Sequence, residues 1–278
     1  MIDLRCHLLE EGGRAGNTAA ATAAGPDEAL RMCHLAAGEG VSAIVAPLKW
    51  PGGARRPPLD FEEYARRLDG LRRGLGDAGP RLVSGFVLEL SEDLPALVEE
   101  YGTRLAIGGG HYLLVSLPAL EAPPSIESVW DRLGRLGFGV VVARPECCAA
   151  LRQDSARLAR WAAGGVILQL DAASITGAHG REAQRFARQL VRDHGSAGRI
   201  VVASNAHDTG ASRPSLATAA ASLRATYGRA LARQLVERTP ALVVGEGVGG
   251  RRGERAASLR RAGAGLLRML RGGAVQQG

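Results

Sequence analysis

Residues 139–163 read GVVVARPECCAALRQDSARLARWAA, and this stretch contains one complete strand-and-helix unit. Its first five residues, 139–143, form an apolar, β-branched run typical of a strand that is buried on both faces. Residues 148–163 place apolar side chains at helical spacing among arginines, which predicts a helix with one buried face. A parallel strand followed by a covering helix is the repeat from which α/β folds are built.

The same unit recurs along the whole chain. Apolar runs predict strands at residues 1–4, 42–46, 82–90, 104–107, 112–117, 139–143, 166–170, 200–204 and 241–244. Helical periodicity predicts helices at residues 27–38, 60–75, 125–136, 148–163, 181–194 and 214–237. Because six or seven such units follow one another, the pattern favours a barrel of parallel strands surrounded by helices over an open sheet.

The composition excludes some classes of protein. No apolar run approaches the ~20 residues of a membrane span, and no basic leader precedes an apolar stretch, so we expect a cytoplasmic protein. The net charge is +7, but Lys49 is the single lysine and no basic stretch is interleaved with aromatic residues. Because stacking on bases needs such aromatic residues, no nucleic-acid partner is expected.

Two stretches fall outside the strand-and-helix rhythm. Residues 10–25 are small, polar and rich in glycine, which predicts a loop above the first strand. Residues 249–278 form a basic tail in which 251–271 can be read as an amphipathic helix. We therefore expect a barrel at 1–247 and a tail at 248–278, which either packs on the barrel, frays, or contacts a partner or an anionic membrane.

Polar residues gather where the predicted strands end. In an extended strand alternate residues share a face, so Asp3, Arg5 and His7 point the same way, unlike the face of a core strand. Active sites of βα barrels lie at the carboxyl ends of the strands. At or just beyond the carboxyl ends of the predicted strands after the first, the polar residues are Lys49, Glu89, Ser116, Arg144, Asn205 and His207.

Several motifs follow one another in a consistent order: MIDLRCH at 1–7, VVVARPE at 140–146, QLDAASITG at 169–177 and VASNAH at 202–207. The chain resembles the bacterial protein-tyrosine phosphatases of the CpsB/YwqE kind, in the polymerase-and-histidinol-phosphatase (PHP) superfamily, over roughly residues 1–247. The resemblance implies a distorted, TIM-like PHP barrel and a cluster of divalent metals such as manganese. It also implies removal of phosphate from tyrosine kinases that control capsule and exopolysaccharide export.

The residues that would hold those metals mostly differ from the family pattern. The family's His-x-His is Arg5-Cys6-His7, and its Pro-His-His is Pro47-Leu48-Lys49. The carboxylate positions carry Val87, with Glu89 two residues later, and Ser116. The family's Ala-His-Pro-Glu-Arg is Ala143-Arg144-Pro145-Glu146-Cys147, and its Ser-Asp-Ala-His is Ser204-Asn205-Ala206-His207.

Only His7 and His207 remain of the side chains that the resemblance assigns to metal. A metal cluster needs carboxylates and imidazoles to offset its charge, and here cationic side chains take their places. We expect no hydrolytic cluster and no cofactor. A single ion on His7, His207 and Asn205, or manganese or zinc in a divergent centre, is the competing interpretation.

The substitutions keep positive charge at the barrel mouth, and the planar fork of arginine suits phosphate. We therefore predict a pseudophosphatase that binds an anion, or a phosphorylated tyrosine kinase of polysaccharide export, through Arg5, Lys49, Arg144 and Asn205. Alternatively, Arg5 and Arg144 pair with Asp3, Glu89 or Glu146 and only stabilise the barrel.

Two further readings stay open. One is an active metal-dependent phosphatase that draws ligands from Glu10, Glu11 or Asp208, and the other is a scaffold that acts through its basic tail. No catalytic residue is predicted. Cys147 lacks the Cys-to-Arg spacing of cysteine-dependent phosphatases, although His179 could reach the barrel mouth.

Overall fold

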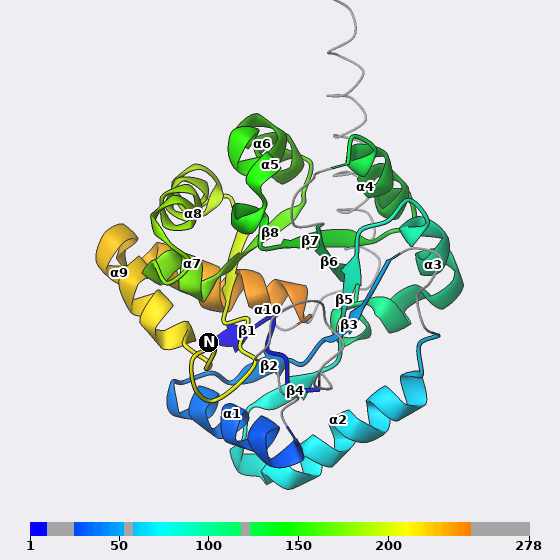
Figure 1. Cartoon of the computed structure of the whole chain (residues 1–278), viewed down its shortest axis with the longest axis vertical. Helices are drawn as coiled ribbons and strands as arrows, with labels where there is room; N and C mark the ends of the chain where they lie inside the picture. Colours follow the sequence, from blue (N-terminus) through cyan, green and yellow to red (C-terminus); the bar gives the residue numbers. More distant parts are fainter. Residues whose placement is uncertain (10–24, 53–57, 118–122, 246–278) are drawn as a thin grey trace, which may run out of the picture.

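A computed structural model describes residues 1–9, 25–52, 58–117 and 123–245 of the chain. Parallel strands occupy its centre and helices surround them (Figure 1). The predicted loop at 10–25 lies almost entirely outside the described residues, and the tail at 248–278 lies wholly outside them. None of the described helices has the length and apolar character needed to cross a bilayer.

All strand pairs are parallel and fall into two groups, ordered β1-β2-β4 and β3-β5-β6-β7-β8-β9. The strands are β1 (Ile2–Asp3), β2 (Ala43–Val45), β3 (Leu48–Trp50), β4 (Arg81–Val83), β5 (Phe86–Glu89), β6 (Tyr112–Ser116), β7 (Gly139–Ala143), β8 (Ile167–Asp171) and β9 (Ile200–Ala203). The α-helices are α1 (Pro26–Gly38), α2 (Phe61–Leu75), α3 (Leu94–Tyr101), α4 (Ile126–Arg135), α5 (Ala149–Gln153), α6 (Ser155–Ala163), α7 (Ala172–Thr176), α8 (Arg181–His194), α9 (Leu216–Arg233) and α10 (Thr239–Val243).

The two groups of strands belong to one distorted barrel. Only two residues separate β2 from β3, and two separate β4 from β5, so each pair continues one interrupted strand. The last strand returns to the first, because Cys6 pairs with Ala206 in an isolated parallel bridge. Backbone hydrogen bonds from His7 to Ala206 (2.8 Å) and from Asn205 to Arg5 (2.9 Å) flank that bridge.

Alternation along the strands divides the core into two layers. In β7, Val141 lies in the barrel interior, whereas Val140 and Val142 face the surrounding helices. Burial of both faces explains why the strands are continuously apolar. The interior contains mostly Val, Ala and Ile, which fit its narrow cross-section.

Two predicted strands are wrong. Residues 104–107 belong to 3-10 turns, Gly102–Leu105 and Ile107–Gly109, and residues 241–244 lie mostly in α10. Ile107 and Val243 nevertheless join the interior cluster with Ile2, the first residue of β1. These runs are apolar because they fill the amino-terminal end of the barrel, and a short apolar run does not by itself distinguish strand from helix.

Other element boundaries also differ from the predictions. The predicted strand at 82–90 is split between β4 and β5, and the predicted helix at 148–163 is split between α5 and α6. The predicted helix at 214–237 covers α9 and part of a π-helical turn, Gln234–Arg238. The short elements β3, α3 and α7 have no counterpart among the predicted elements.

Candidate functional site

Buried polar side chains collect at the carboxyl ends of the strands. They include Asp3 and Arg5 at β1, Glu146 after β7, and Asp171 at the end of β8. Because burial of polar groups is costly without partners, each of these side chains needs a hydrogen-bond or charge partner, and for Asp3 and Glu146 these include backbone N–H groups. The side chains and their partners form two groups, one around β1 and β9 and one around β7 and β8.

The first group joins Arg5, His7, Asn205 and His207. The guanidinium Nε of Arg5 donates to Nε2 of His7 at 3.1 Å, and Oδ1 of Asn205 lies 3.1 Å from the same nitrogen. The rings of His7 and His207 stack with centroids 4.1 Å apart and planes 6° apart. The fold thus brings together four of the predicted site residues, which lie almost 200 residues apart in the chain.

Asp3 holds this first group in place. Its Oδ1 accepts hydrogen bonds from the backbone N–H groups of Ser204 (3.0 Å) and Arg5 (3.2 Å). One carboxyl therefore holds together the segments that follow β1 and β9. Burial raises the pKa of Asp3 to about 6, although the hydrogen bonds from Ser204 oppose this shift. The Asp3 carboxyl is therefore buried, positions the backbone of Arg5 and Ser204, and is not exposed to a ligand.

The second group surrounds Arg144. Its Nε lies 3.1 Å from Oδ2 of Asp171, and its Nη2 donates to Sγ of Cys147 at 3.5 Å. Nδ1 of His179 lies 3.7 Å from the same sulfur and 3.8 Å from Oδ2 of Asp171. The Arg144 side chain as a whole remains 35% exposed.

A second buried carboxyl supports this group. Oε1 of Glu146 accepts the backbone N–H of Asp171 at 2.8 Å, which joins the turn after β7 to the end of β8. Burial raises the pKa of Glu146 to about 7, and the neighbouring charge of Asp171 adds to the shift. A large fraction of Glu146 is therefore neutral near pH 7, which leaves more of the positive charge of Arg144 uncompensated.

The remaining predicted positions lie apart from these two groups. Lys49 is exposed on β3, and no hydrogen bond or ion pair joins it to another described residue. Glu89 and Ser116 are paired in register between β5 and β6. Oε2 of Glu89 accepts a hydrogen bond from the backbone N–H of Gly52 at 3.3 Å, so Glu89 stabilises the loop after β3.

The ion pairs differ from the expected ones. The carboxylate in contact with Arg144 is Asp171, not Asp3, Glu89 or Glu146. Sequence reasoning gave Asp171 no role, although it stands in the specific QLDAASITG motif at a strand end. Asp208, a proposed alternative ligand, accepts backbone N–H groups of Gly210 and Ser212 and so stabilises its own turn. Glu10 and Glu11 lie outside the described residues.

The donor set does not fit a metal cluster. Within the described ranges, no group of three or more His, Cys, Asp and Glu side chains is arranged to hold a metal ion. A cation bound to Nε2 of His7 would also have to displace the guanidinium of Arg5. Even single like charges ~4 Å apart repel by roughly 4 kcal/mol at an effective dielectric constant of 20.

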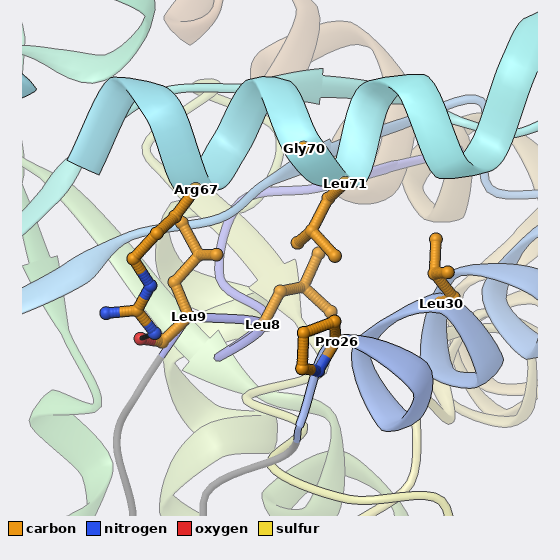
Figure 2. Close-up of a pocket in the computed structure, with 7 residues that line it drawn as sticks. All are labelled: Leu8, Leu9, Pro26, Leu30, Arg67, Gly70 and Leu71. Atoms are coloured by element: carbon orange, nitrogen blue, oxygen red, sulfur yellow. Dashed lines mark hydrogen bonds between the residues drawn. The ribbon is translucent and has the colours of Figure 1, made fainter. Parts of the chain in front are cut away.

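A cavity of about 230 Å³ lies between α1 and α2 (Figure 2). Its lining is apolar except for Arg67 and comprises Leu8, Leu9, Pro26, Leu30, Arg67, Gly70 and Leu71. Arg67 reaches from α2 to the backbone oxygen of Leu9, to which it donates at 2.6 Å. The cavity offers no acid, base or nucleophile, so the chemistry of the site lies in the two polar groups.

Comparison with known proteins identifies relatives that match about two thirds of the chain. Tyrosine-protein phosphatase YwqE of Bacillus subtilis (strain 168) is 24% identical over 198 residues, which are 69% of this chain and 72% of that protein. Putative tyrosine-protein phosphatase CapC of Staphylococcus aureus is 24% identical over 196 residues, with the same shares.

A solved structure confirms the distorted barrel. It belongs to a study of YwqE from Bacillus subtilis and CpsB from Streptococcus pneumoniae, described as unique metal-dependent tyrosine phosphatases. It superposes with a TM-score of 0.75 at 21% identity and covers 89% of this chain and 96% of that one. The model of the family named for capsular polysaccharide synthesis, CpsB/CapC, matches residues 1–245. This chain therefore belongs to the CpsB/CapC family.

Proposed function

We propose that this chain is a non-catalytic member of its family, which binds a phosphate-type anion at the barrel mouth without hydrolysing it. The observation that carries the proposal is the hydrogen bond from Nε of Arg5 to Nε2 of His7. Nε2 of His7, a nitrogen suited to a metal, here accepts a hydrogen bond from a permanently charged side chain. A guanidinium stays protonated throughout the physiological range, so it supplies a built-in cation at this position.

Arg144 supplies the contact that is open to a ligand. Asp171 lies against its Nε, while 35% of the side chain is exposed at the carboxyl end of β7. Arginine can bind a carboxylate and a phosphate oxygen at once, because its five N–H donors point in different directions. Asn205 contributes an amide beside His7, and Lys49, which lies apart from both polar groups on β3, adds an exposed positive charge.

The family suggests the source of the anion. The relatives are named as tyrosine phosphatases, and the family is named for capsular polysaccharide synthesis. We infer that the ligand is phosphotyrosine on a kinase of polysaccharide export. The protein would shield or recruit the phosphorylated kinase and leave the phosphate in place.

Metal analysis and turnover test this proposal together. We expect the purified protein to hold far less than one metal ion per chain and to release no phosphate from a phosphotyrosine peptide with added manganese or zinc. Near-stoichiometric metal, with turnover abolished by His7→Ala, would contradict the proposal and establish a divergent metal centre.

Binding of the same peptide gives the positive evidence. Arg144→Gln should weaken binding by about tenfold, the value of one charge-assisted contact. Arg229→Gln is the matched control, because Arg229 is exposed on α9, and it should leave the affinity unchanged. Equal affinities of the two variants would exclude Arg144 from the anion site.

A further inference from the structure

The four cysteines differ in their access to solvent. Cys6, Cys33 and Cys148 are buried, whereas Cys147 is partly exposed. All four are free thiols. A reagent that enters the barrel mouth therefore meets the sulfur of Cys147 first.

Three polar side chains converge on that sulfur. Nη2 of Arg144 lies 3.5 Å from Sγ, Nδ1 of His179 lies 3.7 Å from it, and Oγ of Ser174 lies 3.9 Å from it. Ser174 and His179 are also 3.4 Å apart, so the three form one cluster around the thiol. A guanidinium, an imidazole and a hydroxyl are the groups that stabilise a thiolate or an oxygen bound to sulfur.

We propose that Cys147 is a modification site, at which a hydroperoxide oxidises the thiol to a sulfenic acid held by Arg144, Ser174 and His179. The thiolate attacks one oxygen of the peroxide, so an S–O bond forms as the O–O bond breaks. The leaving hydroxide takes up a proton and becomes water. Sulfur loses two electrons and the peroxide gains them; an external thiol reverses the step through a mixed disulfide.

Solvent access to the sulfur decides which cysteine is oxidised, and the pKa of the thiol limits the rate of oxidation. Burial raises the pKa of the Cys147 thiol, the Glu146 carboxyl adds to this, and Arg144 opposes it. The pKa of Cys6 is raised further, well above its ordinary value, and that of Cys33 is raised to about 12. Oxidation of Cys147 should therefore be slow at neutral pH, accelerate as the pH rises, and remain selective.

The modification would also control the anion site. The oxygen of a sulfenate is an acceptor for Nη2 of Arg144, which belongs to the guanidinium that we assign to the bound phosphate. Oxidation and anion binding therefore compete for one guanidinium. This consequence rests on the proposed function, whereas oxidation of Cys147 does not.

The test treats the full-length protein with hydrogen peroxide, traps sulfenic acid with dimedone and measures labelling of each cysteine by mass spectrometry. Cys147 should be labelled at least about tenfold faster than Cys6 or Cys33. Cys147→Ser should abolish the label and Cys148→Ser should retain it. Arg144→Gln should slow labelling about threefold or more, with partial rescue by Arg144→Lys, while the control Arg229→Gln should not.

Equal labelling of all four cysteines in the folded protein would overturn the proposal. So would an unchanged rate in a folded Arg144→Gln variant, with folding checked by thermal unfolding. Phosphotyrosine-peptide binding is measured on the same samples before and after oxidation. Loss of binding on oxidation in the native chain, but not in Cys147→Ser, would establish the competition. Absence of binding before oxidation contradicts the proposed function alone.

Discussion

Arg144 and Asn205 are the two non-glycine residues in the described part of the chain with left-handed backbone, at φ 55° and 53°. This conformation costs on the order of 1 kcal/mol for arginine and less for asparagine, whose short side chain tolerates it. Arg144 directly follows β7, Asn205 lies two residues beyond the end of β9, and both belong to the proposed anion site. Strain at such positions is typical of functional residues that the surrounding structure holds in place.

The Glu146 carboxyl should make stability depend on pH. Its pKa is about 7 in the folded protein against an ordinary value of 4.5, so between these values the folded state holds a proton that the unfolded chain loses. The free energy of unfolding therefore falls as the pH rises from about 4.5 to about 7, by on the order of 3 kcal/mol.

Glu146→Gln should remove the Glu146 contribution to this decline and leave that of Asp3, whose pKa is also raised, because glutamine still accepts the N–H of Asp171 but does not ionise. The variant should match the native chain near pH 4.5 and exceed its stability at pH 7.5, as measured by urea unfolding across this range. Glu182→Gln, at an exposed position of α8, is the control and should follow the native curve. Parallel curves for all three proteins would show that Glu146 does not titrate in this window.

At the scale of elements, one carboxylate joins two helices of the outer layer. Glu127 of α4 accepts hydrogen bonds from Nε and Nη2 of Arg157, both at 2.7 Å, and from Nε1 of Trp161 at 2.8 Å. Arg157 and Trp161 belong to α6. Burial opposes the ionisation of Glu127, but these hydrogen bonds outweigh it and lower the pKa of the carboxyl.

Glu127→Ala should destabilise the protein by about 2 to 3 kcal/mol, because it leaves a charged donor and an indole N–H without their acceptor. Glu237→Ala is the matched control, since Glu237 accepts from Nε of Arg233 at 3.0 Å but both side chains are largely exposed. Its loss should cost less than about 1 kcal/mol. Urea unfolding of both variants measures the difference in the free energy of unfolding. Equal losses of stability would show that burial does not strengthen the Glu127 contacts.

At the scale of the whole molecule, one side-chain hydroxyl forms hydrogen bonds at both breaks in the barrel strands, the one between β2 and β3 and the one between β4 and β5. Tyr64 of α2 donates from its hydroxyl to the backbone oxygen of Ala46 and accepts the N–H of Gly85, both at 2.8 Å. Ala46 lies between β2 and β3, and Gly85 lies between β4 and β5. Burial raises the pKa of Tyr64 to about 12, so the hydroxyl keeps its proton and both hydrogen bonds persist.

Tyr64→Phe should therefore destabilise the barrel by about 2 to 4 kcal/mol, because two buried backbone groups lose their partner. Tyr227→Phe is the same change at a partly buried position, where the hydroxyl donates to the backbone oxygen of Arg188 at 3.1 Å and water can replace it. It should cost under about 1 kcal/mol. Similar thermal midpoints for the two variants would show that Tyr64 does not join the strand segments.

The sequence by itself determined the parallel βα barrel, the family and the positions of the long elements. Strands β7 and β9 and helices α2 and α8 were predicted within one residue at each end, because a continuous apolar run marks a strand buried on both faces and helical periodicity over several turns marks a helix with one buried face. The apolar runs at 104–107 and 241–244 were assigned wrongly, because strand and helix both bury short apolar segments and only the closed barrel decides between them. Motif order also predicted that residues of the metal-binding type are replaced at the mouth, which metal analysis has to test.

The tertiary structure alone decided which charges meet. The pairing of Arg144 with Asp171, the approach of His179 to Cys147, and the enclosure of His7 by Arg5 and Asn205 depend on distances between separate strand ends. Sequence spacing does not encode these distances, since side-chain contacts across a barrel depend on register and on loop geometry. The electrostatic character of the mouth, a set of guanidinium groups supported by two buried carboxyls with raised pKa values, therefore follows only from the folded chain.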